Sequence, residues 1–198
     1  MSKAKPQSSA EQLNVLIEET TNALGGTDQT YIKTISFLNK QQKLSMPSRL
    51  MRGQMVFFKY KPVSESFISR NKYYDAYPLV LLTDVYRGGF EGINLHYIEG
   101  DERTFLFENI MRSMPVMRGN EEWRNRISLS YDKLNASRKF KFFRPCYKRY
   151  LWEGLVRRPV VIPFEYWETM MKAETSRFAK SKPVTVHRDS KISVIRGG

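Results

Sequence analysis

The sequence predicts an α+β fold in which a small bent antiparallel sheet carries an N-terminal helical pair and peripheral helices. Apolar residues recur at helical spacing on both sides of a central region that is rich in β-branched and aromatic runs. Two of those runs are joined by Gly88-Gly89, which leaves no room for a helix between them. Strands this close in sequence pair antiparallel, so we expect a strongly bent or barrel-like sheet and not a doubly wound one.

The first 47 residues are predicted to form a helical extension. The run from Ser8 to Glu11 has the spacing of a capping box, and the helix that follows ends at Gly25-Gly26. Asp28 can cap a second helix, which breaks before Pro47.

Three strands are predicted next, over residues 54–60, 78–86 and 92–98. Each is rich in β-branched or aromatic residues and is bounded by glycine or proline, which is typical of strands. The third strand alternates apolar with polar residues, so we expect His96 to face solvent or to form a local hydrogen bond.

Helices are predicted again after the third strand. Helical spacing returns from Asp101 and again over residues 123–134, and a strand over 156–162 is expected to return to the same sheet. Pro163 lies at the first turn of a last helix, after which the chain is polar, basic and predicted to be extended. These elements divide the chain into the N-terminal helical extension 1–47, an α+β core domain 48–173 and a basic extended tail 174–198.

Positive charge dominates the chain. It holds 33 Lys and Arg against 20 Asp and Glu, a net charge of +13, and residues 138–158 are densest, with Glu153 as their single acid. Basic groups that neutralise phosphates give salt-sensitive binding without sequence preference, and the interleaved aromatic rings can stack on exposed bases unless they belong to the core. The candidate nucleic-acid-binding residues are Arg138, Lys139, Lys141, Arg144, Tyr147, Lys148, Arg149, Arg157 and Arg158, with Lys59 and Lys61 on the first strand.

Other classes of protein are disfavoured by the composition. No run of about 18 apolar residues could span a membrane, and the N-terminal Met-Ser-Lys-Ala-Lys-Pro has no apolar signal segment. With one cysteine and two histidines, we expect no internal disulfide, no structural metal and no cofactor. We therefore expect a protein made in the cytosol that has polyanionic partners and no membrane contact.

The sequence gives little support for catalysis, and we expect no enzymatic activity. The sequence contains neither a Walker loop nor a G-x-G-x-x-G motif. Cys146 lies between Arg144 and Lys148 and could have a lowered thiol pKa, but no histidine is near it in the sequence. His187, in the basic tail, would be at most a phosphate contact.

A magnesium-dependent nuclease would need converging carboxylates. The central region offers Asp75, Asp84, Glu91 and Asp101, but their spacing does not define a site, and pairing with Arg and Lys is the simpler interpretation. Asp75 lies between tyrosines just before Pro78, where we expect it to accept backbone N–H bonds in a fixed turn.

Several motifs resemble one family of virion proteins. They run from Gly53 to Pro62, from Tyr73 to Leu81 and from Gly89 to Ile98, and they contain Y-x-P, Y-Y-D-x-x-P-L-V and G-F-x-G-x-N-x-H-Y. Two later segments also resemble this family, Arg144 to Tyr150 and Ile162 to Trp167, so that the likeness covers about half the chain. The pattern is similar to the DNA end protector (head-completion) family of T-even-like tailed phages.

This resemblance implies a non-enzymatic structural role in a bacteriophage virion, in a protein made in the host cytoplasm. A few copies would sit on the end of packaged DNA near the portal or neck and shield it from host exonuclease. The implied partners are DNA ends, bound without sequence preference, and other virion proteins. The alternative is a head–tail connector or tail component whose basic surface meets acidic virion proteins, and it predicts no DNA binding by the free chain.

Overall fold

The structure is a computed structural model, and it describes residues 49–64, 73–113, 143–156, 158–172 and 178–196, with Ser36 and Lys40 as isolated positions. The helical pair predicted at the N-terminus lies outside the described residues, apart from those two positions. The helix predicted over 123–134 lies outside them entirely.

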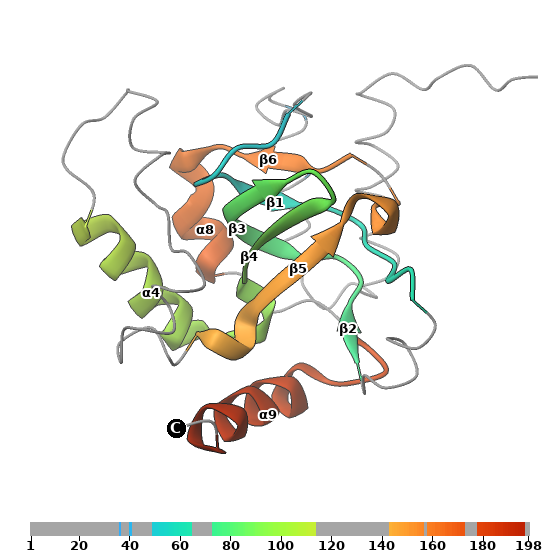
Figure 1. Ribbon diagram of the computed structural model, residues 1–198. Coiled ribbons are helices and arrows are strands. Elements are labelled where there is room, and N and C mark those ends of the chain that lie inside the picture. The colour runs from blue at the N-terminus through green and yellow to red at the C-terminus, as the bar shows by residue number, and fades with distance from the viewer. Residues whose placement is uncertain are drawn as a thin grey trace, which may run out of the picture.

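A five-stranded antiparallel sheet forms the centre of the molecule (Figure 1). Its strand order is β5-β4-β3-β1-β6, and every neighbouring pair is antiparallel. The strands are β1 (Met55–Phe57), β3 (Leu79–Tyr86), β4 (Gly89–Asn94), β5 (Tyr147–Leu151) and β6 (Val160–Ile162). The predicted α+β class is confirmed, but the barrel-like alternative is wrong, because the sheet is not closed and β5 and β6 are its two edges.

Smaller elements connect and flank the sheet. A two-stranded ladder joins β2 (Tyr74–Asp75) to β7 (Phe178–Ala179), two segments about a hundred residues apart in the chain. Four 3-10 turns are described: η1 (Leu95–Tyr97), η2 (Arg144–Cys146), η3 (Trp152–Gly154) and η4 (Phe164–Tyr166). The helices are α4 (Gly100–Ser113), α8 (Trp167–Lys172) and α9 (Pro183–Arg196).

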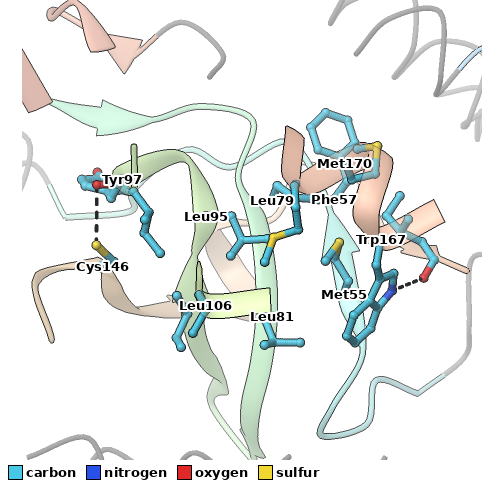
Figure 2. Packing of buried hydrophobic residues seen from close by; sticks show 14 of the residues in the cluster. Met55, Phe57, Leu79, Leu81, Leu95, Tyr97, Leu106, Cys146, Trp167 and Met170 are labelled. Atoms are coloured by element: carbon cyan, nitrogen blue, oxygen red, sulfur yellow. Dashed lines mark hydrogen bonds between the residues drawn. The ribbon is translucent and has the colours of Figure 1, made fainter. Parts of the chain in front are cut away.

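The two faces of the sheet carry separate apolar clusters, because side chains alternate along each strand. On one face, Phe57 and Leu81 pack with Leu106 of α4, Trp167 of α8 and Val186 of α9 (Figure 2). The Trp167 indole N–H donates to the Ile162 carbonyl at 3.0 Å, which fixes α8 against β6. The opposite face holds a smaller cluster: Leu50, Val56, Phe58, Val80, Leu82, Phe90 and Tyr150. Within the described residues, no helix is both long and apolar enough to cross a membrane.

The third strand departs from its prediction at Asn94. The Asn94 side-chain oxygen accepts the His96 N–H at 2.9 Å and so caps η1, which ends β4 four residues earlier than expected. His96 is therefore not on an alternating strand. It is buried and does not face solvent, but it does form a local hydrogen bond, through its N–H to Asn94, which was the other part of the expectation.

The C-terminal segment also departs from its prediction, whereas the helices before it agree. Helical structure from Asp101 is confirmed as α4, and Pro163 directly precedes η4 and α8. The extended tail is wrong for the described part, because residues 183–196 form α9. Pro183 begins this helix, where the fixed φ of proline suits the first helical position.

Candidate nucleic-acid interface

A pocket of about 310 Å³ opens beside the edge strand β5. The segment that follows β1 and the short strand β2 complete its wall. The side of this pocket is formed by four tyrosines and two basic residues: Tyr60, Tyr74, Tyr97, Tyr150, Lys148 and Arg149. Its volume is at the lower end of the range for ligand pockets, which is about 300–1,000 Å³.

The pocket exists because the chain beyond β5 folds back onto the continuation of β1. Tyr60 forms an isolated antiparallel bridge with Leu155, and the Lys61 N–H donates to the Gly154 carbonyl at 2.9 Å. A Cβ atom on Gly154 would lie 2.5 Å from the Tyr60 ring and 2.9 Å from the Lys61 carbonyl oxygen, so only glycine fits between them. This close approach holds Tyr60 at the mouth of the pocket.

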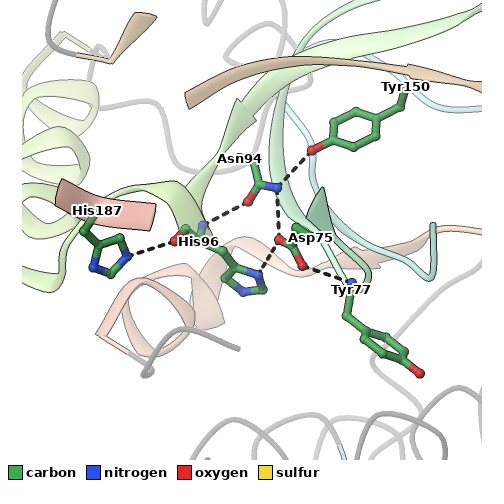
Figure 3. A network of polar contacts seen from close by, with 6 residues as sticks. All are labelled: Asp75, Tyr77, Asn94, His96, Tyr150 and His187. Carbon is green, nitrogen blue, oxygen red and sulfur yellow. Dashed lines mark hydrogen bonds and ion pairs between the residues drawn. The ribbon is translucent and has the colours of Figure 1, made fainter. Parts of the chain in front are cut away.

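A buried polar network lies behind the tyrosines (Figure 3). One oxygen of the Asp75 carboxylate accepts the Tyr77 N–H at 3.0 Å. The other accepts from Asn94 Nδ2 at 3.0 Å and lies 2.8 Å from His96 Nδ1. Asn94 Nδ2 also donates to the Tyr150 phenol at 2.9 Å. The expectation that Asp75 accepts a backbone N–H in a fixed turn is confirmed, and the network adds two further ligands to its carboxylate.

The two histidines are both fixed by this region. The side chains of His96 and Asp75 are only 1% and 2% exposed, so the pair is sealed from solvent. His187 lies on α9, where its Nε2 is 3.0 Å from the His96 carbonyl oxygen, and burial lowers its pKa. A neutral ring can donate this N–H to the carbonyl, which ties α9 to η1.

Lys148 is the basic residue that the pocket holds most closely. Its Nζ lies 4.3 Å from the centre of the Tyr97 ring, which is within cation–π range. Burial lowers the pKa of Lys148 from its ordinary value. The ammonium group therefore sits in a less polar environment than a surface lysine, where an anionic partner would stabilise its charge.

Three tyrosines of the pocket, Tyr60, Tyr97 and Tyr150, keep their phenol protons at neutral pH. Burial raises the pKa of Tyr60, and burial together with the nearby Asp75 carboxylate raises the pKa of Tyr97 and of Tyr150 well above the ordinary value. The wall thus presents hydroxyl groups and aromatic rings rather than phenolates.

The structure separates the residues that the basic–aromatic stretch was predicted to bring together. Lys148 and Arg149 line the pocket, whereas Tyr147 is buried on the other face, where its phenol donates to Glu91 Oε1 at 2.6 Å. Arg149 is exposed and pairs with Glu91 at 2.9 Å. Strand alternation separates Tyr147 from Lys148, because neighbouring residues of β5 point to opposite faces, whereas Arg149 shares the face of Tyr147 and both bond to Glu91.

The other predicted cations among the described residues do not line the pocket. Arg144 is exposed on η2, Lys61 is exposed next to Tyr60, and Arg158 is exposed just before the far edge strand β6. Lys59 is half-buried, with Nζ 5.9 Å from the centre of the Tyr77 ring. The positions outside the described residues are Arg138, Lys139, Lys141 and Arg157.

The residues weighed for catalysis have structural explanations. Burial raises the pKa of the Cys146 thiol to about 12, so the idea of a lowered pKa is wrong. Asp84 pairs with Arg52, and Glu91 pairs with Arg149, which confirms for these two carboxylates the interpretation as ion-pair partners. In the described part of the chain, no three metal-ligating side chains cluster.

The sequence predicted Lys148 and Arg149 of the pocket lining but not the tyrosines that meet them there. Tyr60, Tyr97 and Tyr150 come from three separate segments, and nothing in their local spacing indicates that they meet. One signal was present, since Asn94 and His96 are polar residues in an otherwise apolar run and could have indicated a buried polar partner. No protein-family model, curated protein or solved structure matches the chain.

Proposed function

We propose that this protein is a virion component of a tailed bacteriophage that binds the end of packaged DNA and shields it from host exonuclease. It binds without sequence preference and catalyses no reaction. The observation that carries the proposal is the tyrosine-lined pocket that holds Lys148 beside the basic edge strand β5. The motifs that resemble the DNA end protector family include Tyr60, Asn94 and Tyr150, which contribute to this pocket or to the network behind it.

The size of the pocket favours a DNA end over a continuous duplex. A volume of about 310 Å³ suits one nucleotide-sized group and not a helix. Bases inside a duplex are paired and stacked, and extruding one costs about a few kcal/mol, with the lowest cost where the base is already unpaired. A frayed terminal nucleotide could therefore reach the tyrosines with little penalty, and each stacked base would contribute about 1–3 kcal/mol.

The charge of the chain supplies the rest of the affinity. A net charge of +13 attracts the phosphate backbone irrespective of sequence. Exposed cations near the pocket, such as Lys61 and Arg144, would contact phosphates behind the terminal nucleotide. Since these contacts release counterions, binding should weaken steeply as salt concentration rises.

Exonuclease digestion tests the proposal most directly. Linear duplex DNA should be digested more slowly when the protein is present, and linear competitor should reverse this protection better than circular competitor. If the protein gives no protection, or if circles compete as well as linear DNA, the end-binding function is wrong. Loss of DNA in a control with Mg²⁺ but without added exonuclease would contradict the non-enzymatic role.

A pair of lysine variants separates specific phosphate contact from total charge. Lys61→Met should weaken DNA binding and reduce the slope of log affinity against log salt by about 0.9, which is the value for one phosphate contact. Lys191→Met removes the same charge, but Lys191 already pairs with Glu99 and Glu102. The second variant should therefore leave the slope unchanged. Equal effects of both variants would mean that only net charge matters.

One observation favours the connector as a second candidate function. Val184 and Ile195 of α9 are 79% and 78% exposed, and Ile192 is 38% exposed. Exposed apolar side chains on one helix are typical of a protein contact. A connector would bind other virion proteins through α9 and would not retain linear DNA, so the same binding assay distinguishes the two functions.

A further inference from the structure

The hydrogen bonds inside the pocket leave its tyrosines as donors. The Tyr60 phenol oxygen accepts the Leu151 N–H at 3.3 Å, and the Tyr150 oxygen accepts from Asn94 Nδ2 at 2.9 Å. The Tyr97 oxygen accepts the backbone N–H of Asp75. A phenol has one proton, and an oxygen that accepts from the protein keeps that proton for another acceptor. The pocket therefore contains three O–H groups that can donate.

The amide orientation of Asn94 secures this assignment. Its Oδ1 accepts the His96 N–H at 2.9 Å, so the other atom of the amide must be the nitrogen. That nitrogen has two protons, which go to the Asp75 carboxylate and to the Tyr150 oxygen. Tyr150 is consequently an acceptor toward Asn94 and must donate elsewhere.

The acceptors around the pocket are already used within the protein. Asp75 is among the lining residues, but its carboxylate is buried, where it takes the Tyr77 N–H and the Asn94 amide and lies 2.8 Å from His96 Nδ1. Lys148 adds an ammonium group with three donor protons, and among the described residues it has no carboxylate partner. The Lys148 ammonium and the tyrosine phenols of the lining are donors of the kind that bind an anion.

We propose that this pocket binds a phosphate monoester, the terminal phosphate of a DNA strand, through Lys148 and the phenols of Tyr97 and Tyr150. The inference rests on the proposed binding of DNA ends and adds the group that is recognised there. A monoester differs from the phosphodiesters of the backbone because it carries up to two negative charges and three terminal oxygens. Only the end of a strand offers such a group, so the pocket would distinguish an end from the rest of the duplex.

Binding to differently ended DNA tests the inference. The probes are one duplex in three linear forms, with 5′-phosphates, with 3′-phosphates or with hydroxyl groups only, and a circle of the same sequence. We expect one phosphorylated form to bind at least about tenfold more tightly than the hydroxyl form, as for a charge-assisted hydrogen bond. If the three linear forms bind equally and all bind more tightly than the circle, the proposed phosphate site is wrong. The proposed binding of DNA ends would still hold.

Failure of the proposed function gives a different result. If the circle binds as tightly as every linear form, end binding is wrong and the phosphate preference is wrong with it. Inorganic phosphate at constant ionic strength provides an independent measurement on the unaltered protein. It should displace the phosphorylated duplex and should not displace the hydroxyl-ended duplex. Equal displacement of both, or of neither, would contradict a monoester site.

Two matched variants locate the effect in the pocket. Lys148→Met keeps the apolar stem and removes the charge, so the preference for a phosphorylated end should fall about tenfold with little change for the hydroxyl-ended duplex. Lys61→Met removes an exposed charge next to the pocket and should weaken both duplexes equally. A preserved preference in Lys148→Met would overturn the assignment.

A milder substitution guards against a folding defect. Tyr97→Phe removes one donor proton and keeps the ring under the Lys148 ammonium, so the preference should fall several-fold, and thermal unfolding separately measures the loss of the acceptor for the Asp75 N–H. If Tyr97→Phe folds normally and keeps the full preference, the phenol of Tyr97 is not a ligand and the proposed donor set is wrong.

Discussion

Carboxylates have different environments near the two ends of β4. Near its start, Glu91 meets Arg149, whose side chain is 72% exposed, and the neighbouring Asp84 meets Arg52, which is 51% exposed. Beyond its end, Asp75 is buried with Asn94 and His96. The same functional group is thus a surface ion-pair partner at one end and the centre of a sealed network at the other.

The two environments should contribute differently to the stability of the fold. Exposed ion pairs contribute about 0–1 kcal/mol, because water and salt screen them and two long side chains must be ordered. Removing one member of a buried pair leaves its partners without hydrogen bonds and costs about 3–5 kcal/mol. The network behind the pocket should therefore govern the stability of this part of the fold, and the arginine pairs should contribute little.

The largest effect is expected for Asp75→Ala. This change leaves Asn94 Nδ2, His96 Nδ1 and the Tyr77 N–H without their acceptor, so the free energy of unfolding should fall by about 3–5 kcal/mol. Urea denaturation measures it. Asp84→Ala is the matched control, with an expected loss of no more than about 1 kcal/mol. Equal losses in the two variants would remove the distinction between the two ends.

An intermediate effect is expected for Tyr147→Phe. The Tyr147 phenol donates to Glu91 Oε1 at 2.6 Å and lies 2.9 Å from the buried Thr83 hydroxyl. Losing these bonds should lower the free energy of unfolding by about 1–2 kcal/mol. Tyr86→Phe removes a phenol from an exposed tyrosine and should change stability by less than about 0.5 kcal/mol. If Tyr147→Phe leaves the free energy of unfolding unchanged, Glu91 behaves only as a surface ion-pair partner.

Local patterns predicted the second strand closely, whereas the third was expected over 92–98 and is Gly89–Asn94, and β5 was not predicted. In the structure, alternation along β3 places Leu79 and Leu81 on one face and Val80 and Leu82 on the other. Helix α9 was missed although Pro183 gave a start signal, because the segment is polar and buries chiefly Val186. Its position depends on contacts with η1 and η2, which no local pattern reveals.

The candidate site could be predicted only in part, for the same reason. The excess of cations near β5 is visible in the sequence, and strand alternation alone separates Lys148 from Tyr147. The pocket, in contrast, needs Tyr60, Tyr97 and Gly154 to meet, and these residues come from distant segments. Long-range contacts of this kind arise from the fold as a whole, so a single sequence without the structure does not specify them.

A smaller effect is expected for the Arg149–Glu91 pair. A double-mutant cycle with Arg149→Met and Glu91→Gln should give a coupling of about 0.2–1 kcal/mol at low salt. Because the Arg149 side chain is 72% exposed while that of Glu91 is 14% exposed, the coupling should weaken near about 1 M salt, where the screening length is only about 3 Å. If the coupling is undiminished at high salt, the Arg149–Glu91 pair behaves like the buried network around Asp75. The difference between the two ends of β4 would then be smaller than proposed.

The smallest effect concerns the surface pair between Lys191 of α9 and Glu99. The hydrogen bond and charge of Lys191 lower the pKa of Glu99 below its ordinary 4.5. A lowered carboxyl pKa stabilises the fold above the ordinary value, and this contribution is lost as pH falls through the lowered one. Unfolding of the wild type and of Lys191→Met should therefore differ slightly at neutral pH and converge in acid. A difference that persists in acid, where the carboxyl partner is protonated, would mean that the Lys191 stem packs against the fold.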